Sequence, residues 1–320
     1  MRALVIDRSG TLSLRDREKP DGGGAECVIR VTAAGICGTD LELLRGYAGF
    51  EGIPGHEFVG VVEDAPAEDR RWVGRRVAGE ITVGCGRCAA CRAAGRGHCE
   101  ARTVVGIRNR DGAFAEYLSL PASNLHALPE SLQDFTAVFV EPTAAACRVV
   151  EQVRIDSDTR AAVVGAGRLG LLIAQVLQAS GARPLVVARG ERGRSIAASL
   201  GFETASAGAP AFSQAFDVVV DATGNADGFA AARRLVRPRG TIVVKSTFHG
   251  ETPVNMSSLV VDEITVVGSR CGPFDRAIEL LDSGRVDVTR LLEGIYPLER
   301  FREAFEQAER GMKTILAPGD

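Results

Sequence analysis

The sequence predicts an α/β plus β protein, in which a β domain precedes a doubly wound parallel sheet, and three observations support this fold class. Short strand-like runs separated by glycine and proline fill residues 1–120. Strand-like and helix-like apolar runs alternate from residue 161 onward. Glycine makes up 37 of the 320 residues, against about 7% in an average protein. Nucleotide-binding α/β proteins use such glycine in tight turns between short apolar runs.

The N-terminal runs have the length and composition of antiparallel strands. These runs are residues 3–6, 27–33, 58–63 and 115–120. Short runs with β-branched side chains and flanking turn formers favour strands over helices. Residues 141–152 then place alanine and valine on one face of a predicted helix.

From residue 161 the pattern predicts strands that are buried on both faces. Strands are expected at 161–165, 184–188, 217–224, 241–246 and 264–269, with helices at 169–180, 191–201 and 227–236. Continuous apolar strands alternating with helices form a parallel sheet that helices cover on both faces. Helices near 274–283 and 299–310 and a short strand at 313–316 are expected to end the chain.

The composition argues against several classes of protein. With 38 basic and 41 acidic side chains, the net charge is −3, which does not suit a surface for nucleic acid or anionic lipid. No apolar run approaches the ~18–20 residues of a membrane span, and the N-terminus does not resemble a secretory signal. We therefore expect a cytoplasmic protein, whose eight cysteines do not form a disulfide framework.

Residues 165–170 read GAGRLG and predict a dinucleotide site, because they lie between an expected strand and an expected helix. Gly165 permits a tight turn, Gly167 lets the backbone approach a pyrophosphate, and Gly170 allows close packing of helix and sheet. Unpaired N–H groups at the start of the helix favour phosphate. The predicted cofactor ligands here are Gly165, Gly167, Arg168, Leu169 and Gly170. The alternative is a glycine-rich turn that binds nothing.

The end of the next predicted strand favours NADP over NAD. An NAD site places an acidic side chain there, about 20 residues after the glycines, to accept hydrogen bonds from the ribose hydroxyls. Here the strand ends at Ala188, and Arg189, Arg192 and Arg194 follow. Arginine pairs well with a 2′-phosphate. Two alternatives remain: Glu191 serves a ribose, or the arginines form a solvated helix face.

Four of the eight cysteines, Cys85, Cys88, Cys91 and Cys99, lie within 15 residues of one another. Four thiolates this close in sequence suit a tetrahedral structural Zn²⁺ that leaves no open position for chemistry. The alternatives are an iron–sulfur cluster and four free thiols. His98 is expected to be a surface residue of this segment rather than a ligand.

A second group of candidate ligands is scattered along the chain. Cys37 lies in GICGTD, His56 and Glu57 lie in GHEFVG, and Glu141 lies in VEP. Each residue alone is weak evidence. Together, a thiolate, an imidazole and carboxylates match a catalytic zinc with room for water or substrate.

These pieces resemble the zinc-dependent medium-chain dehydrogenase/reductase family, which includes alcohol, polyol and threonine dehydrogenases. The matching motifs occur in family order over nearly the whole chain: GICGTD, GHExxG, the four cysteines, GAFAEY, VEP, GAGRLG, DATG and GSR. The resemblance implies two zincs and hydride transfer to NAD(P). It also implies a GroES-like catalytic domain over 1–140, with the zinc lobe at 85–99. A Rossmann domain over 141–275 and a segment 276–320 that returns to the first domain complete the chain.

The same resemblance implies roles for individual residues. Cys37 and His56 become ligands of the catalytic zinc, and Glu57 or Glu141 completes the shell directly or through water. Thr39 resembles the hydroxyl that takes the alcohol proton. Asp40 resembles a residue that orients His56, with a turn or helix cap as the alternative. Thr223, in DATG, and Arg270 resemble cofactor contacts, with a surface charge as the alternative for Arg270.

The chain also departs from the family pattern. Many relatives have a histidine two residues beyond the CGTD motif that relays the proton to solvent, and this chain has Glu42. The proton path then runs through Glu42 or through water alone. Residues 63–72 replace the usual glycine-rich hairpin. The substrate pocket is expected near Tyr47, Phe50 and Phe114, and Phe248 and His249 are expected on the nicotinamide side.

We therefore expect an NAD(P)-dependent zinc alcohol dehydrogenase that acts on a secondary alcohol or polyol, or reduces the matching ketone or aldehyde. The alternatives are a redox-sensing protein without turnover and a zinc-ribbon module that uses arginines around 87–110 to bind nucleic acid. Residues 260–270 resemble the edge strand through which the family pairs subunits, so a homodimer or homotetramer is expected.

Overall fold

The computed structural model describes residues 1–208, 212–248 and 250–319, so His249 lies outside the described residues. The chain divides into two compact units. The first contains Met1–Glu141 and the residues from Leu291 onward, and the second contains Pro142–Arg290. Among the described residues, no helix has both the length and the apolar character needed to cross a membrane.

The first unit is built on a seven-stranded sheet. Its strands run in the order β16-β17-β3-β4-β5-β9, and β8 pairs with β3 outside this order. The elements of this sheet are β3 (Cys27–Gly35), β4 (Glu57–Asp64), β5 (Arg76–Gly79), β8 (Tyr117–Leu120), β9 (Leu125–Ala127), β16 (Leu292–Pro297) and β17 (Lys313–Ala317). Strand β17 pairs antiparallel with β3, and Ile315 lies opposite Gly35. Two strands that are far apart in the sequence are therefore neighbours in this sheet.

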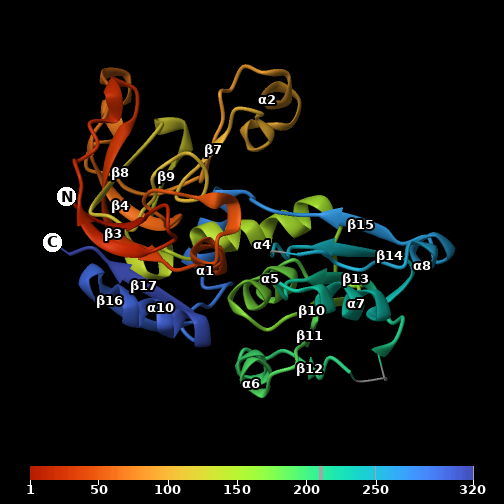
Figure 1. The fold of residues 1–320 in the computed structure, drawn as a ribbon. Coiled ribbons are helices and arrows are strands. Elements are labelled where there is room, and N and C mark those ends of the chain that lie inside the picture. Colours follow the sequence, from red (N-terminus) through yellow and green to blue (C-terminus); the bar gives the residue numbers. More distant parts are fainter. Residues whose placement is uncertain (209–211, 249, 320) are drawn as a thin grey trace. The chain divides into compact units, whose positions relative to one another are not determined.

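Smaller elements surround this sheet. Two separate antiparallel pairs are β1 (Arg2–Ile6) with β2 (Leu12–Asp16), and β6 (Thr82–Val83) with β7 (Thr103–Val104). The helices are α1 (Gly38–Leu44), α2 (Ala89–Ala94), α3 (Asp134–Ala137) and α10 (Phe301–Arg310). Helix α10 buries Phe301, Ala304, Phe305 and Ala308, the spacing of one helical face. Figure 1 shows α2 within the lobe formed by the cysteine-rich segment.

The second unit is a doubly wound sheet of six parallel strands. Its order is β12-β11-β10-β13-β14-β15, with β10 (Ala161–Val164), β11 (Leu185–Val187), β12 (Thr204–Ala205), β13 (Phe216–Asp221), β14 (Val236–Val244) and β15 (Thr265–Gly268). This is the nucleotide-binding order 3-2-1-4-5-6, which reverses direction between β10 and β13. Every residue of β10 is buried, as a central parallel strand requires.

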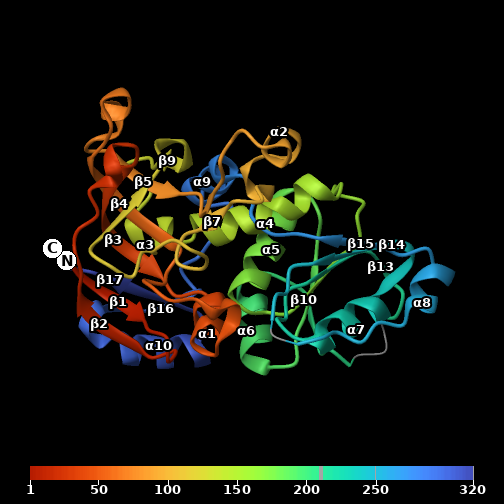
Figure 2. The ribbon, with the colours of Figure 1, turned by 45° about the horizontal axis from the view of Figure 1, so that its top comes forward.

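Helices accompany these strands, as Figure 2 shows. They are α4 (Val140–Gln152), α5 (Arg168–Ala179), α6 (Glu191–Ser199), α7 (Ala226–Leu235), α8 (Met256–Val261) and α9 (Phe274–Asp282). Residues 170–177 of α5 are all buried, because this helix lies against the sheet next to β10.

The structure refines two of the expected boundaries. Residues 276–290 group with the second unit, because α9 buries Phe274, Ala277, Leu280 and Leu281 and Gln175 of α5 hydrogen-bonds to Asp287. The expected edge strand at 260–270 is shorter, since 260–261 end helix α8 and the strand begins at Thr265. The predicted α/β plus β architecture, with a β domain and a doubly wound parallel sheet, is otherwise confirmed.

Candidate active site and cofactor cavity

The four predicted cysteines converge in the lobe between β6 and β7. Cys88 caps helix α2 and accepts a hydrogen bond from the Cys91 N–H at 3.4 Å. The Sγ–Sγ distances are 3.6 Å for Cys85–Cys99, 3.9 Å for Cys88–Cys99 and 4.0 Å for Cys85–Cys91. Zinc–sulfur bonds of ~2.3 Å give a tetrahedron whose edges are about 3.8 Å. The sulfur atoms therefore have the spacing of a closed four-thiolate zinc site.

The electrostatics of this lobe also suit a metal. Backbone N–H groups of Arg87 and Cys88 lower the pKa of Cys85 to about 6, so this thiol ionises readily. Burial instead raises the pKa of Cys91. A cation among the four sulfur atoms favours the thiolate form of each cysteine.

The second predicted constellation is also assembled, although its members come from distant parts of the sequence. Cys37 directly precedes α1, while His56 and Glu57 stand at the start of β4, where Glu57 lies opposite Gly35 of β3. Potential ligand atoms of Cys37, His56 and Glu57 all lie within 4.8 Å of one another. Glu141 is not part of that group of described residues.

Asp40 lies behind His56, as the resemblance implied. Both side chains are buried, and Asp40 Oδ1 is 3.3 Å from His56 Nδ1. Burial lowers the pKa of His56, but the charges of Asp40 and Cys37 outweigh burial and raise this pKa well above its ordinary value. Asp40 also accepts the Cys37 N–H at 2.8 Å through Oδ2. One carboxylate thus contacts both candidate ligands, which leaves Nε2 of His56 for a metal.

Glu57 has a partner that the sequence analysis missed. Lys313 of β17 is 1% exposed and forms an ion pair with Glu57 Oε2, and its Nζ also donates to the Ile36 carbonyl at 3.4 Å. The ion pair joins residues 256 positions apart. The sequence shows a lysine at the start of an apolar strand, which could have marked Lys313 as a buried charge. Nothing in the sequence links this lysine to Glu57.

The structure places the two predicted proton-transfer residues differently. Thr39 lies beside the centre, where its Oγ1 accepts a hydrogen bond from Cys37 Sγ at 3.8 Å. Glu42 Oε1 accepts from Arg45 Nη1 at 2.6 Å, and Arg45 also contacts Glu309 at 3.2 Å. Glu42 therefore belongs to a charged network on helices α1 and α10.

Two of the residues expected at the substrate pocket, Phe50 and Phe114, are buried. The ring of Phe114 packs edge-on against the ring of Phe305.

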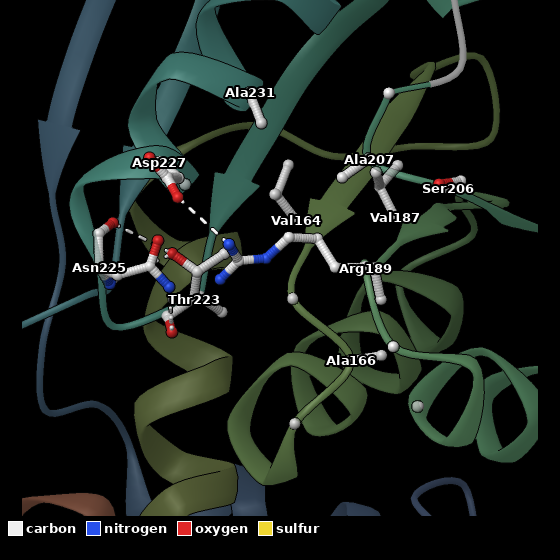
Figure 3. A pocket seen from close by; sticks show the side chains of 18 of the residues that line it. Val164, Ala166, Val187, Arg189, Ser206, Ala207, Thr223, Asn225, Asp227 and Ala231 are labelled. Carbon is white, nitrogen blue, oxygen red and sulfur yellow. Dashed lines mark hydrogen bonds and ion pairs between the residues drawn. The ribbon is translucent and has the colours of Figure 1, made fainter.

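The second unit contains a cavity of about 700 Å³ at the carboxyl ends of β10, β11 and β13 (Figure 3). Gly165 and Gly167 line this cavity. Gly165 has a φ of +110°, and a Cβ at Gly170 would lie 1.9 Å from the Gly165 carbonyl oxygen. These two positions therefore require glycine, one for the turn and one for close packing.

The expected cofactor residues are divided between the cavity and its surroundings. Arg189 and Thr223 line the cavity. Arg168, Leu169 and Gly170 begin helix α5, and Arg194 donates to the carbonyls of Ala188 and Arg189 at 2.9 and 2.8 Å. The guanidinium of Arg194 thus holds the end of β11 rather than reaching the cavity.

The backbone of Arg270 contacts a lysine that the sequence analysis did not identify. This lysine, Lys245, is buried, and its Nζ donates a hydrogen bond to the Arg270 carbonyl at 2.8 Å.

Thr223 is held by a small polar network. Asp221, which is buried at the end of β13, accepts hydrogen bonds at Oδ1 from the Thr223 N–H, the Thr223 hydroxyl and Ser246 at 3.0, 2.8 and 3.1 Å. The sequence analysis also missed Asp227 and Arg234 of α7, which line the cavity. Residues on a later helix carry no sequence signal that connects them to β11.

A parallel sheet with a dinucleotide-type cavity and two clusters of zinc-type ligands defines a zinc-dependent dehydrogenase. The comparisons agree with this class. Residues 23–130 match the alcohol dehydrogenase GroES-like domain, and residues 169–283 match the zinc-binding dehydrogenase domain. The L-threonine 3-dehydrogenase of Streptomyces coelicolor is 32% identical over 99% of both chains. The chain therefore belongs to the zinc-dependent medium-chain dehydrogenase/reductase family.

Two solved structures have the same fold over 99% of each chain. The alcohol dehydrogenase rspB of Escherichia coli CFT073, in complex with NADH, has a TM-score of 0.91 at 26% identity. A zinc-binding dehydrogenase of Sinorhizobium meliloti 1021, bound to NADP, has a TM-score of 0.91 at 28% identity. The chain is an NAD(P)-dependent oxidoreductase of alcohols or polyols. The relatives give no support to a redox sensor or a zinc-ribbon module.

Proposed function

We propose that the protein oxidises a secondary alcohol or polyol, or reduces the matching carbonyl compound, with two zincs and with NADP in preference to NAD. The carrying observation is that Cys37, His56 and Glu57 bring three different ligand types within 4.8 Å. Cys37 and His56 hold the catalytic zinc in this proposal, and Glu57 or Glu141 completes its shell. Cys85, Cys88, Cys91 and Cys99 hold the structural zinc.

A bound catalytic zinc supplies a Lewis acid that lowers the pKa of the substrate hydroxyl. The chain provides the remaining functions. The Thr39 hydroxyl, beside Cys37, accepts the alcohol proton, and Glu42 or water carries this proton to solvent. Asp40 keeps the tautomer and orientation of His56 fixed. Helix α5 and the turn at Gly165 would bind the pyrophosphate of the cofactor, whose nicotinamide would supply the hydride acceptor or donor.

The preference for NADP is supported by the charges around the cavity. Among the described lining residues, three are charged and two of these are arginines, Arg189 and Arg234. No acidic side chain ends β11. Arginine binds a 2′-phosphate through charge-assisted hydrogen bonds. Arg168 and Arg270 are further candidates for contacts with the cofactor phosphates.

Nicotinamide absorbance tests the activity. The zinc-loaded protein is given a panel of alcohols, polyols and hydroxy acids, each with NADP and with NAD. We expect turnover of at least one secondary alcohol, faster with NADP. Cys37→Ser should lose about three orders of magnitude in turnover, about 4 kcal/mol of barrier, whereas Cys271→Ser, outside both clusters, should retain activity. Equal turnover of Cys37→Ser and the unsubstituted protein contradicts the proposed centre.

We also propose a cytoplasmic homodimer or homotetramer that pairs through the edge of the second sheet. Strand β15 is the last strand in that sheet, and Val260, Val261 and Val266 nearby are 72%, 79% and 44% exposed. Exposed valines beside the outer edge of β15, which pairs with no further strand among the described residues, support burial against a second copy. Sedimentation at micromolar concentration tests this assembly, and a monomer contradicts it.

A further inference from the structure

One ion pair spans the cofactor cavity of the second unit. Arg189, which follows β11, extends its side chain across the cavity toward α7 (Figure 3). Its Nη1 lies 3.2 Å from Oδ2 of Asp227, which stands in the first turn of α7. Both residues line the cavity, and their side chains are 70% and 81% exposed.

Asp227 is the only acidic residue among the described lining residues. The other charged groups are Arg189 and Arg234, and Nη2 of Arg234 donates to the Ala207 carbonyl at 3.3 Å. The Asp227 carboxylate is paired with the Arg189 guanidinium, and a phosphate oxygen could accept from that guanidinium in its place.

We propose that Asp227 sets the cofactor selectivity of this enzyme, because its carboxylate takes the place of the 2′-phosphate of NADP beside Arg189 and repels that phosphate when it enters. This inference rests on the proposed preference for NADP. Arg189 exchanges the Asp227 carboxylate for the 2′-phosphate when NADP binds. Asp227 thus weakens a preference that the two arginines create, and the enzyme retains use of NAD.

The size of the effect follows from the exposure of the pair. An exposed ion pair contributes little, so Arg189 leaves Asp227 at small cost. A like charge near a phosphate in a partly open cavity acts on a similar scale. We therefore expect Asp227→Asn to tighten the binding of NADP by roughly two- to five-fold. The dissociation constant of NAD should change by less, so the ratio of the two constants shifts toward NADP.

Calorimetric titration of the zinc-loaded protein measures this directly, without turnover. The ligands are NADP, NAD and two fragments, 2′,5′-ADP and 5′-AMP, which differ only in the 2′-phosphate. Asp227→Asn should tighten 2′,5′-ADP more than 5′-AMP. The gain should shrink as salt is raised, because both side chains are exposed.

Two further variants separate this role from a general change of charge. Glu263→Gln neutralises another exposed carboxylate, which contacts Arg239 at 3.4 Å and is not among the described lining residues of the cavity. This variant should leave the binding of both fragments unchanged. In an Arg189→Gln background, Asp227→Asn should give a smaller gain, since the released partner is absent.

The outcomes distinguish this inference from the proposed function. If the unsubstituted protein binds 2′,5′-ADP no better than 5′-AMP, the preference for NADP is wrong. If that preference holds and Asp227→Asn leaves the ratio unchanged, the role of Asp227 is wrong. A loss of NAD affinity in Asp227→Asn also overturns it, because Asp227 then accepts a hydrogen bond from the ribose.

Discussion

The cysteine lobe and the Cys37 centre both collect metal ligands, but they are built in different ways. The lobe takes its four sulfur atoms from residues 85–99, where Cys88 caps one short helix and Cys91 lies within it. The centre takes Cys37 from the N-cap of α1, His56 from the residue before β4 and Glu57 from the first residue of β4. Glu57 is paired with Lys313 of β17. One cluster is local in sequence, whereas the other exists only when the sheet has formed.

This difference explains the chemistry available to each cluster. Four sulfur atoms with tetrahedral spacing leave no position for substrate, so the lobe suits a structural role. The centre mixes sulfur, imidazole and carboxylate, and one of its members, Glu57, is already paired. Three ligands would leave the fourth position of a tetrahedral zinc for water or substrate.

The largest expected effect is loss of metal from the lobe. Cys99→Ser removes one of four thiolates, and structural zinc contributes about 10–16 kcal/mol of apparent binding free energy that also folds the segment. We expect the zinc content to fall from two ions to one per chain, and the lobe to become sensitive to protease. Atomic absorption and limited proteolysis measure these changes.

The reciprocal variant sharpens the comparison. Cys37→Ser should also reduce the zinc content by one, but the lobe should stay resistant to protease, because its ligands are contained in residues 85–99. If Cys99→Ser also empties the Cys37 centre, the two clusters are not independent and the contrast between them is wrong.

A smaller effect is expected from the ion pair that the centre requires. Lys313→Met leaves the Glu57 carboxylate buried without its partner, and breaking a buried pair costs about 3–5 kcal/mol. Urea unfolding of the substituted and unsubstituted proteins measures this difference in the free energy of unfolding.

The double variant Glu57→Gln/Lys313→Met controls for the change of shape. It removes both charges, so it should be more stable than Lys313→Met alone. A double variant that is as unstable as the sum of its parts indicates that packing, rather than charge, holds Lys313 of β17 beside Glu57 of β4.

The same contrast decides how much the sequence could predict. The parallel sheet, the GAGRLG turn and the cysteine lobe are recorded in short runs of sequence, so periodicity and spacing are sufficient to find them. The pairing of Glu57 with Lys313 joins residues 256 positions apart, and Asp227 meets Arg189 over 38 positions. Such contacts depend on sheet order and helix rotation, which single-sequence patterns do not encode.

Arg194 is a second case in which the sequence could not predict a side-chain contact. The run of arginines after β11 predicted a cofactor contact for both Arg189 and Arg194. Because helix α6 places Arg194 four residues beyond its N-cap Gly190, the guanidinium returns to the carbonyls of Ala188 and Arg189. The sequence identifies Arg194 as a charged residue near the end of β11, but only the helix geometry shows which groups its guanidinium contacts.

The smallest effect tests whether the lobe is as independent as its ligands suggest. Arg110 Nη1 and Nη2 each donate to a carboxylate oxygen of Glu26 at 2.9 Å, and Arg110 Nε donates to Thr103 of β7 at 3.0 Å. Burial raises the pKa of Glu26, but hydrogen bonds from Arg110 and Ser119 outweigh it and lower this pKa below its ordinary value. Arg110 therefore links Thr103 of β7 to Glu26, the residue before strand β3 of the main sheet.

Glu26→Gln should lower the free energy of unfolding by about 1–2 kcal/mol at neutral pH, because one charge-assisted pair is lost. A depressed folded-state pKa stabilises the protein above the unfolded value of about 4.3, and this stabilisation is lost as the pH falls through the folded value. The difference between Glu26→Gln and the unsubstituted protein should thus vanish in acid. Glu303→Gln, which breaks an exposed pair with Arg300, is the control and should change little. A constant difference at every pH contradicts the ionic link and leaves the lobe attached by its backbone and its metal alone.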